Sequence, residues 1–391
     1  MFARDILTDL LGKPWGEIIG LTIELIGLLT ALSIVVLSLT WMERKLLGRI
    51  QGRMGPMRVG FHGILQPIAD ALKLVLKEDV VPGSADKGLF WFAPLAVFVP
   101  SFMIWITIPV SHDLVLANLD MGLFYIIAFA VLSITGLVMA GWSSASKYAV
   151  LGGLRSAAQL ISYEIPIIMA VISIAMMSQS LNLQVIVEAQ SNIPYALLQP
   201  LALAIFLIAG VAEVGRTPFD IYFAESEIVG GPFVEYSGAH WSVFFLAEYI
   251  NTFAIAILVA LLFFGGWSFP LMPEISALGF LWVGLKTYLV IAVIFWLRGT
   301  LPRLRVDQLM SLAWKVIIPL SFVNIMITAT YLYYGWAWPI LTLISLSITV
   351  TVSYMLYRKI TRPALRTLEE RLAYAKSYNQ SRGQSEVSDA R

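Results

Sequence analysis

The chain has 391 residues, of which 59% are hydrophobic and only 13% are charged, and its formal net charge is +1. Soluble domains carry about 25% charged residues, so the composition excludes that class and indicates a polytopic membrane protein, with no sign of a nucleic-acid partner. The chain contains no cysteine and three histidines. We therefore expect no disulfide, metal centre or covalently bound cofactor on this chain, and any redox centre belongs to a partner or to a diffusible molecule.

Nine apolar segments are long enough to cross a bilayer, because about 20 apolar residues span its core of about 30 Å. They are expected near 18–41, 89–110, 123–142, 160–178, 193–212, 241–267, 275–297, 316–338 and 339–357. This predicts an all-α polytopic membrane protein with about nine transmembrane helices, forming a single transmembrane domain at 1–362. A polar cytoplasmic tail is expected at 363–391.

Lysine and arginine are concentrated in every second connection between the expected spans. Apart from Arg4, Lys13 and Lys286, they all lie at 42–88, 143–159, 213–240, 298–315 or in the tail from Arg358. The connections at 111–122, 179–192 and 268–274 have none. Because basic connections stay on the cytoplasmic side, we expect a bacterial plasma membrane protein with its N-terminus outside and its C-terminus in the cytoplasm.

The first inner connection, 42–88, combines charge, glycine and an amphipathic segment. Apolar residues fall on one helical face, at Ile64, Leu65, Ile68, Leu72, Val75 and Leu76. Asp70, Lys73 and Lys77 fall on the other face, which is typical of a helix lying in the membrane interface. A basic loop that only sets topology is the alternative. The length of the connection and its glycines favour a structured lateral opening.

Five carboxylates share the third inner connection, 213–240, with a single arginine, Arg216. They are Glu213, Asp220, Glu225, Glu227 and Glu235. Such a charge run is ordinarily a solvated face. Here the acids alternate with side chains that avoid water, such as Phe219 and Tyr222. Carboxylates held together in a partly buried place raise one another's pKa, so the pattern favours a cluster that exchanges protons near neutral pH and that faces Arg216.

Four ionisable residues lie within expected spans: Glu24, Glu164, Glu248 and Lys286. Each is costly in a bilayer unless it faces a polar interior or a partner, and is therefore a candidate functional residue. For Glu24, near the outer end of the first span, we favour a structural ion pair. For Glu164, Glu248 and Lys286 we favour a hydrated proton path over structural pairing.

Five sequence runs between Trp41 and Leu320 carry a resemblance to a known family. They are MERKLLGRIQGRMGPMRVGFHGILQPIADALK, SASKYAVLGGLRSAAQLISYEIP, AEVGRTPFDIYFAESEIVGGPFVEYSG, FFLAEY and RGTLPRLRVDQLMSLAWKVIIPL. Through them the chain resembles the H subunit (subunit 1) of NADH:quinone oxidoreductase, respiratory complex I. The resemblance implies a membrane subunit that contacts the hydrophilic quinone-site subunits and the antiporter-like membrane subunits.

The same resemblance implies the functional residues. A lipid quinone, the substrate, would enter a chamber lined by Arg44, Gln51, Arg53, Asp70, Arg216 and Phe219. An acidic proton path would link that chamber to proton translocation through Glu164, Glu213, Glu225, Glu227, Glu235 and Glu248. Catalytic side chains, flavin and iron–sulfur clusters would belong to partner subunits.

Two departures and two alternatives accompany this resemblance. The family commonly has an acid at the position of Phe223, and some bacterial members have a glutamate near Val131, so the acidic path is poorer here. An anchor subunit of a relative that takes electrons from ferredoxin, reduced coenzyme F420 or hydrogen stays open. The intact first inner connection argues only against a hydrogenase-type relative that works without quinone. A stand-alone ion-coupled transporter also stays open, although neither inverted repeats nor broken helices are expected from the pattern.

Overall fold

The computed structural model describes residues 13, 15–112, 114–223, 225–268, 276–356 and 358, and these form helices and turns without a strand. Eight of the described helices are long and apolar enough to cross a membrane, and a further apolar helix, α9, is shorter. The prediction of an all-α polytopic membrane protein is therefore confirmed, with about nine apolar helices. The polar tail expected at 363–391 lies outside the described residues.

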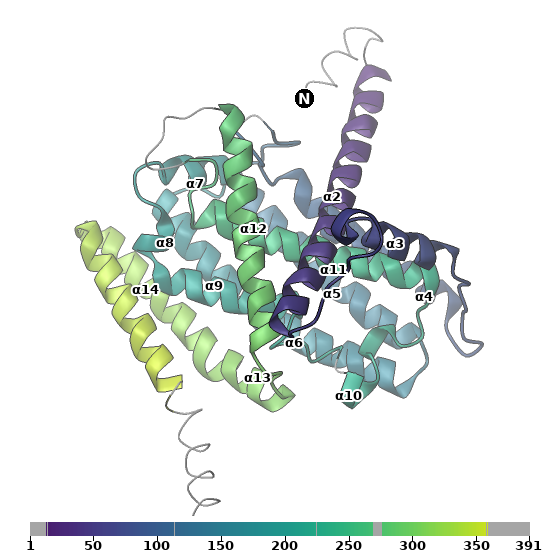
Figure 1. Ribbon diagram of the computed structural model, residues 1–391. Helices are drawn as coiled ribbons and strands as arrows, with labels where there is room; N and C mark the ends of the chain where they lie inside the picture. The colour runs from purple at the N-terminus through teal and green to yellow at the C-terminus, as the bar shows by residue number, and fades with distance from the viewer. Residues whose placement is uncertain are drawn as a thin grey trace, which may run out of the picture.

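The long helices form one bundle, with the last helix along one side and the N-terminal part of α2 extending beyond the other helices (Figure 1). They are α2 (Trp15–Ile50), α4 (Lys87–Met103), α5 (Gly122–Ser143), α6 (Lys147–Ser178), α11 (Gly238–Leu262), α12 (Ser276–Thr300), α14 (Ile318–Tyr334) and the last helix (Trp338–Leu356). A 3-10 turn (Ile104–Ile106) extends α4, and α13 (Val306–Leu312) passes through a π-helical turn (Ala313–Ile317) into α14. The shorter helices are α3 (Gln66–Leu76), α7 (Leu183–Ala189), α8 (Tyr195–Leu198), α9 (Pro200–Glu213) and α10 (Glu225–Ile228), with 3-10 turns at Phe61–Gly63 and Gly231–Phe233.

Helix α11 occupies the centre of the bundle. Its apolar stretch is 72% buried, whereas those of α2 and of the last helix are each 11% buried. It packs against α2, α3, α4, α9 and α12. Its neighbours cover α11 on most sides, so α11 is the element around which the other helices pack.

The connections rich in lysine and arginine join one another at one end of the bundle, which we call the basic end. The amide of Val80 donates a hydrogen bond to Ser237 Oγ over 3.2 Å. The amides of Asp86 and Leu304 donate to the carbonyl oxygens of Ser143 (3.1 Å) and Pro218 (3.0 Å). These bonds tie the connections after α2, α5, α9 and α12 into one surface layer.

Helix α6 is longer than predicted. It begins at Lys147, so most of the expected connection at 143–159 is helical and the expected span at 160–178 is only its second half. The segment from Lys147 to Gln159 contains no proline to stop a helix. Gly152 lets the 3-10 turn at Gly231 approach closely, because a Cβ at Gly152 would lie 2.5 Å from Gly231 Cα.

The span expected at 193–212 is broken between α8 and α9, contrary to the prediction that no helix is interrupted. Pro200 begins α9, where its missing N–H costs least. The break is buried, and side chains of three other helices bond its polar groups. Ser173 Oγ donates to Gln199 Oε1, Gln199 Nε2 donates to Thr328 Oγ1, and Ser345 Oγ of the last helix accepts from the Leu201 amide. A helix can break inside a membrane protein where neighbouring groups form hydrogen bonds with the polar groups that the break frees.

The amphipathic helix predicted in the first inner connection is confirmed as α3. It lies beside α2 and α11 (Figure 1). Its apolar residues are exposed. Leu72, Val75 and Leu76 are all more than half exposed. This unpartnered apolar face is what a helix lying in a membrane interface presents.

Candidate functional site

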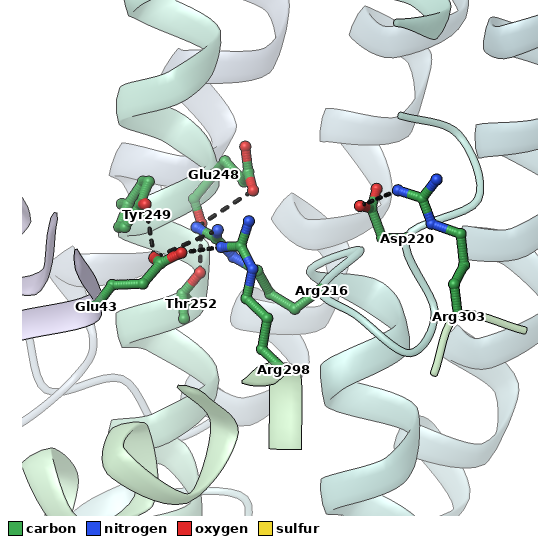
Figure 2. Close-up of polar contacts among 8 residues, drawn as sticks. All are labelled: Glu43, Arg216, Asp220, Glu248, Tyr249, Thr252, Arg298 and Arg303. Atoms are coloured by element: carbon green, nitrogen blue, oxygen red, sulfur yellow. Dashed lines mark hydrogen bonds and ion pairs between the residues drawn. The ribbon is translucent and has the colours of Figure 1, made fainter. Parts of the chain in front are cut away.

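A buried charged network surrounds Arg216, the arginine of the connection after α9. Its side chain is 4% exposed. Nη1 lies 3.5 Å from Glu43 Oε2 of α2, and Nη2 lies 3.2 Å from Glu248 Oε1 of α11. The ring of Tyr249 stacks against the guanidinium at 4.3 Å from the ring centroid. Figure 2 shows these side chains converging from separate elements.

Glu43 is the second centre of the charged network. Its Oε2 accepts a hydrogen bond from the Tyr249 hydroxyl over 2.7 Å, and its Oε1 is paired with Arg298 near the end of α12. The network (Glu43, Arg216, Glu248, Tyr249 and Arg298) thus matches two guanidinium groups with two carboxylates. Buried charges require such matching, because an unpaired ion in a low-dielectric interior costs several kcal/mol.

The charge of Arg216 is stabilised by its neighbours. Burial by itself lowers the pKa of the guanidinium, but Glu248, Tyr249 and Glu43 raise it by more, so the net shift of the pKa is upward. Arg216 is therefore a permanent cation, and the nearby carboxylates are held beside fixed positive charge.

The connection that carries Arg216 is anchored to α6 by Gln159. Its Nε2 donates to the carbonyl oxygens of Ala212 (2.8 Å) and Phe219 (2.7 Å). Gly215 has φ of +68°, and a Cβ there would lie 2.1 Å from the Tyr222 hydroxyl. Glycine is required at this position both for the left-handed backbone and for the close approach of Tyr222.

A cavity lies between α4, α5, α6, α9 and α11. Glu164, Glu213 and Glu248 all line it, and we call it the acid cavity. Asn251 and Ser133 add polar groups, whereas most of the remaining wall is apolar. Glu164 Oε1 and Asn251 Oδ1 are buried without a hydrogen-bond partner among the described residues. Glu248 belongs to both the acid cavity and the charged network.

A sequence model described as NADH dehydrogenase matches residues 23–329 of the chain. Over 311 residues the chain is 45% identical to a protein of Dehalococcoides mccartyi that is named as the H subunit of NADH-quinone oxidoreductase, with 80% of this chain and 86% of that protein covered. The chain belongs to the H-subunit family of NADH-quinone oxidoreductase. Proteins of the same name from Geobacillus kaustophilus (50% identical over 292 residues, covering 73% and 86%) and Brevibacillus brevis (45% over 321 residues, covering 82% and 95%) are also similar.

The six residues that the resemblance placed in a quinone chamber fall into two groups in this H-subunit family member. Four are surface residues of the first connection, where Arg44 Nη1 lies 2.5 Å from Asp70 Oδ2 and Arg53 Nε donates to Gln51 Oε1 over 2.6 Å. The other two are buried. Arg216 is the centre of the charged network. The ring centroid of Phe219 lies 5.7 Å from that of Tyr163.

Of the six residues assigned to a proton path, the structure brings together the three that line the acid cavity. Glu227 instead lies on the surface, with its Oε2 2.7 Å from Arg155 Nη1. Glu235 lines a separate surface hollow beside Lys77 and Glu78. The side chain of Glu225 lies outside the described part of the structure.

The prediction that the acids of the third inner connection face Arg216 is wrong. Its carboxylate partners come from α2 and α11. Asp220 turns away and pairs with Arg303, whose Nη2 lies 2.6 Å from Asp220 Oδ2 (Figure 2). Neighbours in an irregular loop point in different directions, so closeness in sequence does not make them one cluster.

The remaining predicted residues have distinct surroundings. Lys286 Nζ donates to the carbonyl oxygens of Phe264, Gly266 and Ser268 over 2.7–2.8 Å, which favours a structural role over the proton path. Phe223 lines the acid cavity, whereas Val131 is not among its lining residues and is 40% exposed.

Sequence reasoning missed three members of the charged network: Glu43, Tyr249 and Arg298. Two of them adjoin a residue that was singled out, since Glu43 precedes Arg44 and Tyr249 follows Glu248. A usable signal was present, because Glu43 and Arg298 are opposite charges at the same end of two apolar segments. Opposite charges at the ends of two spans can pair when those ends lie at the same depth in the membrane.

Proposed function

We propose that the chain is the membrane subunit of a proton-pumping NADH:quinone oxidoreductase, in which it forms the entrance chamber for the lipid quinone and an acidic path for protons. Membership of the H-subunit family supports the enzyme class. One observation supports the coupling role. Glu248 lies 3.2 Å from Arg216 in the charged network and also lines the cavity of Glu164 and Glu213. A change in the charge of the network is thereby felt by carboxylates in the cavity.

In this proposal the quinone approaches past α3 and the end of α2. The exposed pairs of Arg44 with Asp70 and Arg53 with Gln51 offer charged and polar groups at that surface. Arg216 and Phe219 lie deeper. Guanidinium groups suit such a chamber, because they donate several hydrogen bonds and keep their charge in a low-dielectric setting. The flavin and iron–sulfur clusters would reside on hydrophilic partner subunits.

Protons would move among Glu164, Glu213 and Glu248, toward antiporter-like membrane subunits. Glu225, Glu227 and Glu235 would form a separate part of the path at the surface of the basic end, which partner subunits complete. Burial disfavours the charged form of a carboxylate, so carboxylates grouped in a mostly apolar cavity can hold a proton at neutral pH.

The proposed orientation puts the basic end in the cytoplasm of a bacterium and the N-terminus outside. This cysteine-free chain allows a direct test by single-cysteine labelling. In intact cells an impermeant thiol reagent should modify M121C, at an exposed position of the opposite end, and should modify E78C only after lysis. The reverse pattern would overturn the orientation.

The coupling role is tested with E248Q and E213Q in reconstituted vesicles, because glutamine keeps the shape of the side chain but removes the exchangeable proton. We expect assembly on a native gel to be retained, while quinone-linked turnover and proton pumping fall together. Electron transfer from NADH to a hydrophilic artificial acceptor should survive. D120N, an exposed carboxylate at the opposite end, is the matched control. Full pumping with full turnover in both variants would contradict the proposal.

The names of the relatives favour this function over the two alternatives. An anchor subunit for another donor predicts that the purified complex fails to oxidise NADH and uses ferredoxin, reduced coenzyme F420 or hydrogen. A stand-alone transporter has one supporting feature, the break between α8 and α9, since broken helices line sites in many transporters. Purification of the chain as a stable oligomer without partner subunits would favour that alternative.

A further inference from the structure

The basic end of the acid cavity is lined by aromatic rings. Tyr222, Phe223 and Phe233 from the connection after α9, and Phe244 from α11, line it there. The ring centroids follow one another in an unbroken series, 4.6 Å from Tyr222 to Phe223, 5.0 Å from Phe223 to Phe233 and 4.4 Å from Phe233 to Phe244. We call these four residues the aromatic wall. Rings in van der Waals contact leave no space for a water molecule between them.

The aromatic wall is supported from behind and is fixed in place. Phe244 contacts Tyr236 at 5.0 Å between ring centroids, and Tyr236 stacks on Phe90 of α4 at 4.0 Å. Tyr222, Phe233 and Phe244 are buried, whereas Phe223 is half-buried. Phe223 therefore lines the acid cavity and is the one member of the aromatic wall that is not fully buried.

The hydroxyl groups at the wall offer no route for protons. The Tyr222 hydroxyl donates to the carbonyl oxygen of Val214 over 3.2 Å. The Tyr236 hydroxyl donates to that of Phe90 over 3.3 Å and also contacts Ser143 Oγ. Burial raises the pKa of Tyr222 well above its ordinary value and that of Tyr236 to about 12, so both stay protonated at neutral pH. A proton relay needs consecutive donors and acceptors, which phenyl rings do not supply.

We propose that Phe223 seals the basic end of the acid cavity, so that Glu164 and Glu213 do not exchange protons directly with the adjoining aqueous phase. The ring contacts by themselves support restricted access to the acid cavity at this end. What the closure means for proton movement rests on the proposed function. With this mouth closed, the cavity communicates with the quinone chamber through Glu248, the residue it shares with the charged network. Quinone chemistry then controls the protons, and a passive leak across the subunit is prevented.

Access to the cavity is measured with the substitution S133C. Ser133 lines the acid cavity from α5, and cysteine is close to serine in size. In inverted membrane vesicles that contain the assembled complex, a small cationic methanethiosulfonate reagent reaches the basic end directly. Its reaction with the S133C thiol is followed by mass spectrometry of this chain. With Phe223 present we expect S133C to react at least about tenfold more slowly than E78C, because a charged reagent must cross an apolar wall.

Opening the wall should reverse that protection. F223A and F223E, each combined with S133C, should raise the labelling rate about tenfold or more, whereas F223W, which keeps a large ring, should not. F92A removes an exposed phenylalanine of α4 and is the matched control. Fast labelling with Phe223 intact would overturn the proposal, as would labelling that stays slow in both opening variants. If neither opening variant assembles, the rate of S133C against E78C in the otherwise unchanged chain still decides it.

The measurement needs no catalytic turnover, so it is independent of the coupling experiment on Glu213 and Glu248. Slow labelling of S133C together with normal pumping by E248Q would support the seal at Phe223 and contradict the proton path. Fast labelling of S133C together with impaired pumping by E248Q would support the proton path and contradict the seal.

Discussion

The charged network and the acid cavity share Glu248 but hold their charges in different ways. In the network, Glu43 and Arg216 are each contacted by oppositely charged groups, and Tyr249 adds a hydrogen bond. In the cavity, Glu164 Oε1 is buried with no hydrogen-bond partner among the described residues. Paired buried ions contribute to the fold, because removing one leaves the other uncompensated. A buried carboxyl oxygen without a partner contributes no such bond, which makes Glu164 a candidate functional residue.

The largest expected effect is that of R216M. The change removes the ion-pair partner of Glu248 and leaves Glu43 with Arg298 alone. Breaking this buried pairing should cost about 3–5 kcal/mol of stability and remove the complex from a native gel. R155M is the control, because Arg155 forms a surface pair with Glu227 that should be worth only about 0–1 kcal/mol. Normal assembly of R216M would show that the network does not stabilise the bundle.

Y249F should have an intermediate effect. It removes the hydroxyl that donates to Glu43 Oε2 over 2.7 Å, and a hydrogen bond to a charged group is worth about 1.5–3 kcal/mol. Y288F is the matched control, since the Tyr288 hydroxyl meets Ser38 Oγ at 2.6 Å in a neutral pair worth about 0.5–1.5 kcal/mol. Thermal unfolding of the purified complex compares the two. An equal shift in melting temperature would argue against a special role for Glu43.

R53A should change stability by no more than about 0.5 kcal/mol, because Arg53 is exposed and its bond to Gln51 is local. Its expected effect is on quinone. If Arg53 contacts the quinone on its way in, the apparent KM for a short-chain quinone should rise about tenfold, the loss of one charge-assisted hydrogen bond. NADH oxidation by a hydrophilic acceptor should be unchanged, and R58A serves as the control on the same connection. Unchanged quinone kinetics in the assembled R53A complex would remove Arg53 from the chamber.

E164Q should have the smallest effect on stability, close to zero, because the amide replaces a carboxyl whose Oε1 makes no hydrogen bond to the described residues. Proton pumping and quinone-linked turnover should nevertheless fall, since glutamine cannot release a proton. A native gel and vesicle pumping measured on one preparation provide the test. Loss of assembly would place Glu164 with the structural ions of the network, and full activity would exclude it from the path.

The helical, membrane-spanning character of the chain follows from local sequence. Apolar stretches of about 20 residues and the amphipathic repeat before Lys77 depend only on residues near one another. Both were predicted, although α2 and α6 are longer than expected. The exceptions are instructive. The break at Gln199 depends on Ser173, Thr328 and Ser345, which supply hydrogen bonds from helices distant in sequence. No local signal other than Pro200 indicated it.

For the site, the sequence by itself identified which ionisable residues are out of place in a membrane and, through its motifs, the family. Which of them meet was decided only by the tertiary structure. Arg216 pairs with α2 and α11 instead of with the acids beside it, Lys286 bonds backbone carbonyls, and Phe223 faces the acid cavity. The physical reason is that contacts between helices depend on the rotation and depth of each helix. Packing around α11 sets both, and hydrophobic periodicity along a single segment does not specify them.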